Sequence, residues 1–168
     1  MTLDSLQLEP AARDLLALVP DLEMPLVCKA PVADAGALLR GAKASELFPR
    51  AYSPDAAMAG LWLYFSYFSE AHSIAQDLET PEGSYWHAII HRQEPDAWNS
   101  GYWFRRVGEH PIFPALLAEA KTLGYPGGNH WSPAAFIDYC STGDAAIARA
   151  AQMAEWRLLF AYCARRAK

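Results

Sequence analysis

Apolar residues recur at helical spacing through most of the chain. In residues 9–18, Leu15 and Leu16 belong to a pattern with a period of about 3.6 residues, which predicts a short helix. Residues 33–43 are rich in alanine and leucine and predict a second helix. Between them, residues 21–32 contain two prolines and no helical period, so we expect an extended connector there.

Two Ser/Thr-Pro-acid triplets, at residues 53–55 and 80–82, mark the starts of helices. The Ser or Thr can cap the first turn, the proline suits the first helical position, and the acid suits the positive end of the helix dipole. The first triplet predicts a long helix over residues 54–78. The second predicts a helix that ends just before Pro95, because proline disfavours helical geometry in the residue before it.

The second half of the chain repeats this combination of caps and apolar faces. Asp96, Ser132 and Asp144 each stand where a side chain can cap a helix, and the Gly/Pro cluster at residues 124–128 predicts a loop. Four further helices are predicted, over residues 97–106, 111–123, 133–141 and 145–168. No stretch has the length and alternation of a strand, so the pattern predicts an all-α, single-domain bundle of about seven or eight helices over residues 1–168.

Composition agrees with one folded domain and argues against several classes of protein. The chain has 168 residues, of which 52% are hydrophobic, too many for a disordered protein. Its net charge of −5 leaves no basic footprint for a nucleic acid. The most apolar run, residues 56–68, is shorter than the roughly 20 residues of a membrane-spanning helix, so we expect no membrane partner. No signal-peptide pattern is present at the start, which favours the cytoplasm.

Two further features concern cysteines and the last helix. Cys28, Cys140 and Cys163 are far apart and form no CxxC pair, so we expect buried free thiols. The apolar face of the last helix, which includes Trp156 and Leu159, suits either a core or an interface between copies of the chain.

The chemistry of the chain is concentrated in residues 85–111, where imidazoles, carboxylates, guanidiniums and indoles crowd together. His87 and His91 are four residues apart and share one face of a helix, so the two imidazoles can hold one metal ion. His72 lies on the preceding helix, at a similar distance from the short turn, and can face His87 across the pair.

Other ligands for such a metal ion come from outside this pair of helices. The candidates are His110 and His130, the latter beside a glycine-rich loop where a side chain can reach over a pocket. Zinc, iron and manganese all accept imidazole with carboxylate, so the residue types do not choose among them. The alternative is that each histidine is half-buried and hydrogen-bonded to a neighbouring carboxylate or to the backbone.

Acids and arginines surround Pro95. Glu94 or Asp96 could act as a base toward a metal-bound water, and Arg105 could hold an anionic substrate group. The structural alternative is that Arg92 and Arg106 pair with these carboxylates and hold the kink at Pro95. The nearby aromatic residues fit a core or the wall of a small-molecule pocket; they are Trp86, Trp98, Tyr102, Trp103 and Trp131.

One segment resembles a sequence block of an uncharacterised family of bacterial and fungal proteins. The block consists of His-Arg-x-Glu-Pro-Asp from His91, followed by Tyr-Trp-Phe-Arg-Arg-Val-Gly-x-His-Pro from Tyr102, within residues 85–111. No activity is known for this family, so the resemblance implies a site without assigning a reaction to it.

Together these features predict a small metal-dependent enzyme, a hydrolase of a small polar or anionic molecule. His87 and His91 would bind the metal, with His110, His130 or His72 completing the ligands. One alternative is a non-catalytic module whose aromatic and Arg/Asp pocket binds a small molecule or a peptide without metal. Another is a helical domain whose polar cluster is a buried ion-pair network and whose function is oligomerisation.

Overall fold

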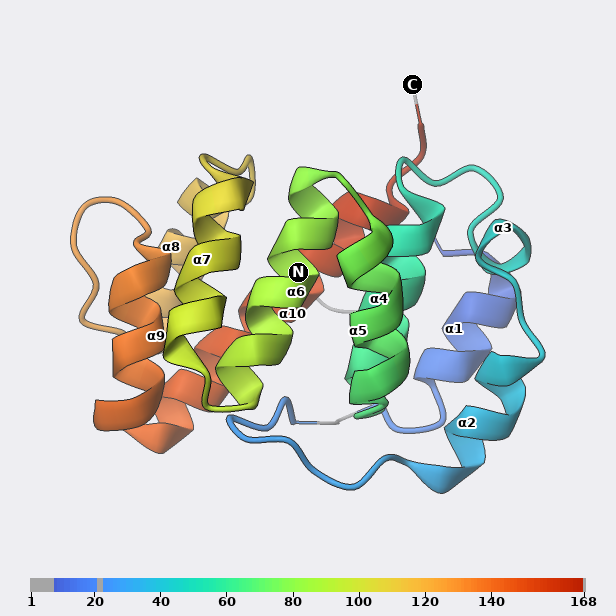
Figure 1. Ribbon diagram of the computed structural model, residues 1–168, viewed down its shortest axis with the longest axis horizontal. Helices are drawn as coiled ribbons and strands as arrows, with labels where there is room; N and C mark the ends of the chain where they lie inside the picture. The colour runs from blue at the N-terminus through green and yellow to red at the C-terminus, as the bar shows by residue number, and fades with distance from the viewer. Residues whose placement is uncertain (1–7, 21–22, 168) are drawn as a thin grey trace.

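The structure is a computed structural model that describes residues 8–20 and 23–167, and the described residues form ten α-helices (Figure 1). In chain order they are α1 (Pro10–Leu16), α2 (Ala33–Arg40), α3 (Ala44–Leu47), α4 (Pro54–Tyr64), α5 (Phe68–Asp77), α6 (Pro81–Gln93), α7 (Ala97–Val107), α8 (Phe113–Thr122), α9 (Pro133–Thr142) and α10 (Ala145–Ala164). Within these residues one isolated antiparallel bridge, between Ala51 and Arg166, is the extent of β pairing. The all-α prediction is confirmed.

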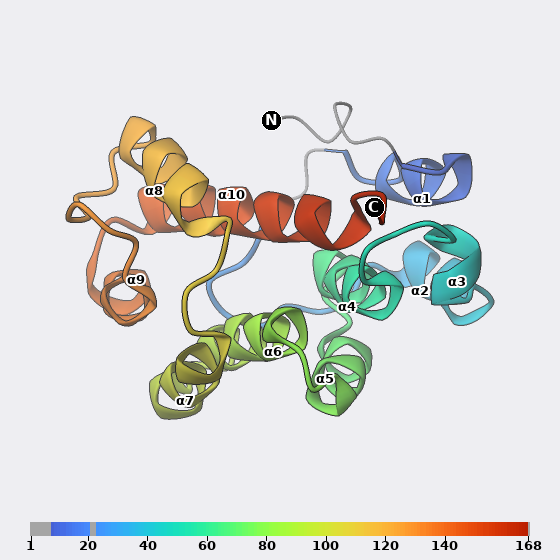
Figure 2. The same cartoon turned by 90° about the horizontal axis from the view of Figure 1, so that it is seen from above.

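The number of helices exceeds the predicted seven or eight because the long helix expected over residues 54–78 is two helices. The chain leaves α4 at Phe65, Ser66 takes a positive φ of 63°, and Tyr67 begins the turn into α5. The backbone N–H of Ser66 donates to the carbonyl of Leu63 at 3.0 Å, which closes the turn. α5 therefore folds back beside α4 and reaches α6 (Figure 2). The other additional element is the single turn α3.

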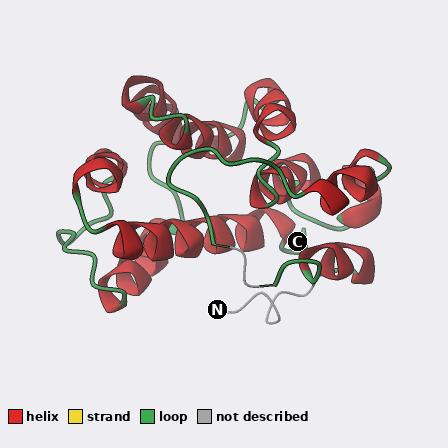
Figure 3. Ribbon diagram, turned by 90° about the horizontal axis from the view of Figure 1, so that it is seen from below, coloured by secondary structure: helices red, strands yellow, loops and turns green. Residues whose placement is uncertain are grey.

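The described part of the connector, residues 23–32, is extended as expected, and it crosses one face of the molecule (Figure 3); residues 21–22 lie outside the described residues. Its polar backbone groups are bonded to helices. The carbonyl of Pro25 accepts from the side-chain amides of Gln93, at 2.7 Å, and Gln152, at 2.6 Å. The N–H of Cys28 donates to the carbonyl of Gln93 at 2.9 Å. These bonds tie the connector to α6 and α10.

The core is built on α10, which runs across the bundle with α4, α5, α6 and α7 on one side (Figure 2). Trp156 is fully buried and its indole N–H donates to the carbonyl of Gly60, at 2.8 Å. Gly60 also lies against the ring of Trp86, so close that a β-carbon there would stand 2.6 Å from it. The apolar face of the last helix thus belongs to the core.

A buried ion pair joins α6 to α10. Arg92 donates to Glu155 and, through Nε at 3.0 Å, to the side-chain oxygen of Gln152. The hydroxyl of Tyr85 donates to the second oxygen of Glu155 at 2.9 Å. Arg92 and Glu155 are 2% and 0% exposed, respectively, so the pair is out of water. The predicted pairing of Arg92 with the carboxylates around Pro95 is therefore wrong; its partner lies on the last helix.

The remaining features of the chain are simpler. All three cysteines are free, but Cys28 is exposed and Cys140 is partly exposed, so burial is confirmed for Cys163 alone. None of the described helices is both long and apolar enough to cross a membrane.

Candidate metal site

Three imidazoles meet between α5 and α6, which lie side by side (Figures 1 and 2). The Nε2 atoms of His72 and His87 are 2.9 Å apart and share a hydrogen bond in which one ring donates and the other accepts. One nitrogen from each of His72, His87 and His91 lies within 4.8 Å of the other two. The prediction that His72 faces His87 across the helix pair is confirmed. We call these three residues the histidine trio.

The position of each imidazole follows from local helix geometry. His87 and His91 are one turn apart on α6, and their rings stack with centroids 4.8 Å apart and planes 18° from parallel. The ring of His72 is nearly perpendicular to both, with centroids 4.3 Å from His87 and 5.5 Å from His91. Thr80 sets the start of α6, because its hydroxyl accepts from the N–H of Gly83 at 3.1 Å.

His87 lies at the centre of the trio and is kept neutral. It is buried, whereas His72 and His91 are partly exposed. Burial, with smaller contributions from His72 and His91, lowers the pKa of His87 from 6.5 to about 3. Metal ligation requires a neutral imidazole, so His87 has the ligand's protonation state at neutral pH.

Trp103 of α7 packs its indole ring against the ring of His87. The two rings are stacked, with centroids 4.0 Å apart and planes 24° from parallel. The guanidinium of Arg106 lies over the same indole, 5.2 Å from its centroid. The sequence predicts Trp103 only as part of a core or a pocket wall, because nothing in the residue spacing shows which side of α7 faces α6.

The trio fits a metal ion with small adjustments. Two nitrogens bound to one zinc ion at about 2.0–2.1 Å stand roughly 3.3 Å apart in a tetrahedral site. The 2.9 Å separation of the His72 and His87 nitrogens is slightly shorter than that, and the 4.8 Å limit for the trio is longer. Ring movements of about 1 Å would bring all three nitrogens to ligand positions.

Glu94 lies beside the trio, on the face where the helical spacing placed it. It is the C-cap residue of α6, and its Oε2 is 3.1 Å from Nδ1 of His91. The Glu94 side chain is 41% exposed, so solvent reaches it. A carboxylate in this position orients a ligating imidazole and raises its basicity. Neither Nδ1 of His91, whose contact with Glu94 is a close charge contact, nor the buried Nδ1 of His87 has a hydrogen-bond partner among the described residues.

The other two candidate histidines do not join the trio. His110 is buried near Glu82 in the first turn of α6, where its Nε2 is 3.9 Å from the carboxylate and its Nδ1 accepts from the N–H of Ile112. The chain turns away from α7 at Gly108, which has a φ of 64°, and this carries His110 to the start of α6. His130 is exposed on the loop before α9.

The other two candidate site residues, Asp96 and Arg105, lie on α7 or at its start. Asp96 is the N-cap of α7, where it accepts from the backbone N–H of Asn99 at 3.0 Å and from its side-chain amide at 2.7 Å. These two hydrogen bonds lower the pKa of Asp96 below its ordinary value, and the bond from the backbone N–H contributes most. The lowered pKa makes the carboxylate a poor base. Arg105 is exposed on α7.

The comparisons with known proteins identify no relative: no family model, no curated protein and no solved structure matches the chain.

Proposed function

We propose that the histidine trio binds one divalent metal ion, such as zinc, iron or manganese, and that the protein is a metal-dependent enzyme. The reaction we propose is hydrolysis of a small polar or anionic molecule. The observation that carries the proposal is the convergence of His72, His87 and His91, from two helices, within 4.8 Å. Three protein ligands with a free coordination position are the pattern of catalytic metal sites.

A metal ion held by three imidazoles would lower the pKa of a bound water to about 7 and supply the nucleophile. Glu94 is placed to take up the proton, because its carboxylate is beside His91 and open to solvent. The stacked Trp103 and the buried side of α6 exclude water from one side of His87. Substrate would therefore approach from the side where His72 and His91 are partly exposed.

The charge and rings of α7 support an anionic or planar substrate. Arg106 lies over Trp103, which itself stacks on His87, and the exposed Arg105 precedes it. Earlier on the helix, the exposed rings of Trp98 and Tyr102 are parallel to within 11°, with centroids 6.2 Å apart. Guanidiniums recognise carboxylate and phosphate groups, and aromatic faces stack on planar ones.

Metal titration of the purified, chelator-treated protein tests the proposal. We expect one equivalent of zinc or cobalt to bind, with the cobalt spectrum showing nitrogen ligands in a low-symmetry site. His87→Ala should abolish tight binding, whereas His130→Ala, which removes an exposed histidine outside the trio, should leave binding unchanged. Failure of the unaltered protein to bind either ion would refute the proposal.

The direct contact between His72 and His87 favours a second candidate, a binding module that works without metal. Their 2.9 Å hydrogen bond already satisfies both Nε2 atoms. In that case the rings of α7 and the nearby arginines would hold a small molecule or a peptide. The same titration separates the two candidates, since a module of this kind binds no stoichiometric metal.

A further inference from the structure

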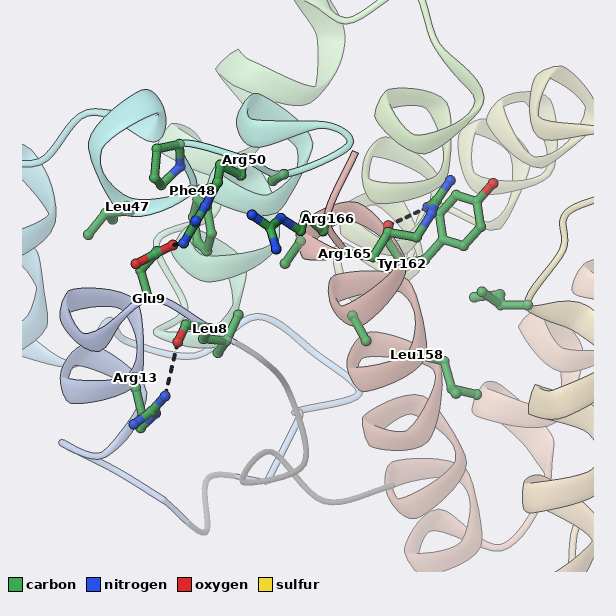
Figure 4. Close-up of a pocket in the computed structure, with 15 residues that line it drawn as sticks. Leu8, Glu9, Arg13, Leu47, Phe48, Arg50, Leu158, Tyr162, Arg165 and Arg166 are labelled. Atoms are coloured by element: carbon green, nitrogen blue, oxygen red, sulfur yellow. Dashed lines mark hydrogen bonds and ion pairs between the residues drawn. The ribbon is translucent and has the colours of Figure 1, made fainter. Parts of the chain in front are cut away.

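A cavity lies against α1, α3 and the C-terminal end of α10 (Figure 4). Its volume is about 660 Å³, and none of the residues that line it belongs to the trio. Cavities that hold small molecules are typically about 300–1,000 Å³. The cavity therefore has the size of a second, independent binding site.

The cavity wall is mostly apolar, and its charges are mostly positive. The apolar lining includes Leu8, Leu47, Phe48, Ile112 and Leu158. Four arginines and one glutamate are the charged residues of the lining, and they are Glu9, Arg13, Arg50, Arg165 and Arg166. An apolar wall of low dielectric strengthens the field of such an excess of positive charge.

Three of the four arginines are engaged within the protein. Arg50 pairs with Glu9 at 2.5 Å, so this carboxylate is neutralised. Arg13 donates to the carbonyl of Leu8 at 3.0 Å. Arg165 lies against the rings of Tyr52 and Tyr162, 3.7 and 3.5 Å from their centroids, and donates to a backbone carbonyl.

Arg166 differs, because its guanidinium has no hydrogen bond or ion pair within the described part of the chain. Its backbone, however, is fixed. Arg166 forms the isolated bridge with Ala51, and the next residue, Ala167, donates to the carbonyl of Arg50 at 2.8 Å. On the other side, the N–H of Tyr52 donates to the carbonyl of Arg165 at 2.7 Å. The fold thus anchors an unpaired cation at the rim of an apolar cavity.

From this charge complementarity we propose that the cavity binds a small amphipathic anion, with an apolar body and one carboxylate or phosphate group. The body would lie against the apolar wall, and Arg166 would pair with the anionic group. The proposal is independent of the metal site, because no residue is shared between them.

Calorimetric titration with decanoate tests this proposal, with decyltrimethylammonium as the probe of opposite charge. We expect the full-length protein to bind decanoate and to bind the cation much more weakly. Arg166→Gln should weaken decanoate binding roughly three- to fivefold, the value of one partly exposed ion pair. Arg149→Gln is the matched control: Arg149 is on α10 and outside the cavity, so this substitution should leave decanoate binding unchanged.

A second variant tests the cavity apart from the charge. Ala161 lines the cavity and is partly exposed, so Ala161→Trp should fill the space and abolish decanoate binding in a protein whose helical circular dichroism is retained. No binding of decanoate by the unaltered protein would overturn the proposal, as would equal affinity for the two probes. Unchanged affinity in Arg166→Gln would do so too. His87→Ala should leave decanoate binding intact whatever the outcome for metal.

Discussion

Removal of Arg92 should destabilise the protein more than removal of any exposed arginine. In Arg92→Met, Glu155 keeps only the hydroxyl of Tyr85, and Gln152 loses the donor 3.0 Å from its oxygen. Because Glu155 is 0% exposed, its carboxylate would be left buried without a counter-charge. Breaking one side of such a pair costs about 3–5 kcal/mol, a large fraction of the roughly 5–15 kcal/mol that stabilises a typical domain.

Urea unfolding followed by tryptophan fluorescence measures this loss. The double variant Arg92→Met, Glu155→Leu should recover most of it, because two apolar side chains replace the pair without a stranded charge. Arg149→Gln removes an exposed pair with Glu23, 3.7 Å apart, and should cost less than about 0.5 kcal/mol. A loss below about 1 kcal/mol in Arg92→Met, or no recovery in the double variant, would refute this account of the α6–α10 contact.

Three further predictions concern His87, two helical glycines and Glu94. The pKa of His87 is lowered from 6.5 to about 3, so the stabilising contribution of its neutral form is fully present above pH 6.5 and is lost as the pH falls toward 3, by at most about 1.4 kcal/mol per pH unit. Urea midpoints should show this slope and lose it in His87→Leu. Gly60→Ala would place a carbon 2.6 Å from Trp86 and should cost about 1–3 kcal/mol, whereas Gly101→Ala, whose nearest neighbour is 3.5 Å away, should stabilise the protein in the same assay. Glu94→Gln should weaken zinc binding about tenfold or more in a competition titration; unchanged affinity would remove Glu94 from the site.

The parts of the fold that follow local rules were predictable from the sequence. The side chains of Thr80, Asp96, Ser132 and Asp144 each accept a hydrogen bond from the first turn of a helix, as their positions indicated. Ser53 makes no such bond, although α4 begins where the Ser-Pro-Asp pattern predicted. Cap residues act within four residues of themselves, so one sequence is enough to find them.

The break between α4 and α5 was hidden because residues 56–68 are almost uniformly apolar. A helix buried on all sides has no polar face, so its pattern carries no period whose interruption would show a turn. Ser66 is an ordinary polar residue in the sequence, and only packing places it at a positive φ.

In the candidate site, too, the local relations between residues were predictable from the sequence and the long-range contacts were not. Helical spacing and a short turn identified His72, His87 and His91, because each relation is local. The partner of Arg92 is 63 residues away, and only the packed bundle brings Glu155 to it. In the sequence, Gln152 and Glu155 stand among the mostly apolar residues of α10, and this polar pair is a signal of a buried partner.

The close spacing of the trio along the chain has a consequence for the order of folding. His72 and His87 are 15 residues apart, so closing the loop between them costs little chain entropy. The α5–α6 hairpin can therefore form before α10 packs against it. At that stage its three imidazoles would already be close together and exposed to solvent. A cation bound at that stage would stabilise the hairpin, and later docking of α7 would stack Trp103 on His87 while His72 and His91 stay partly exposed.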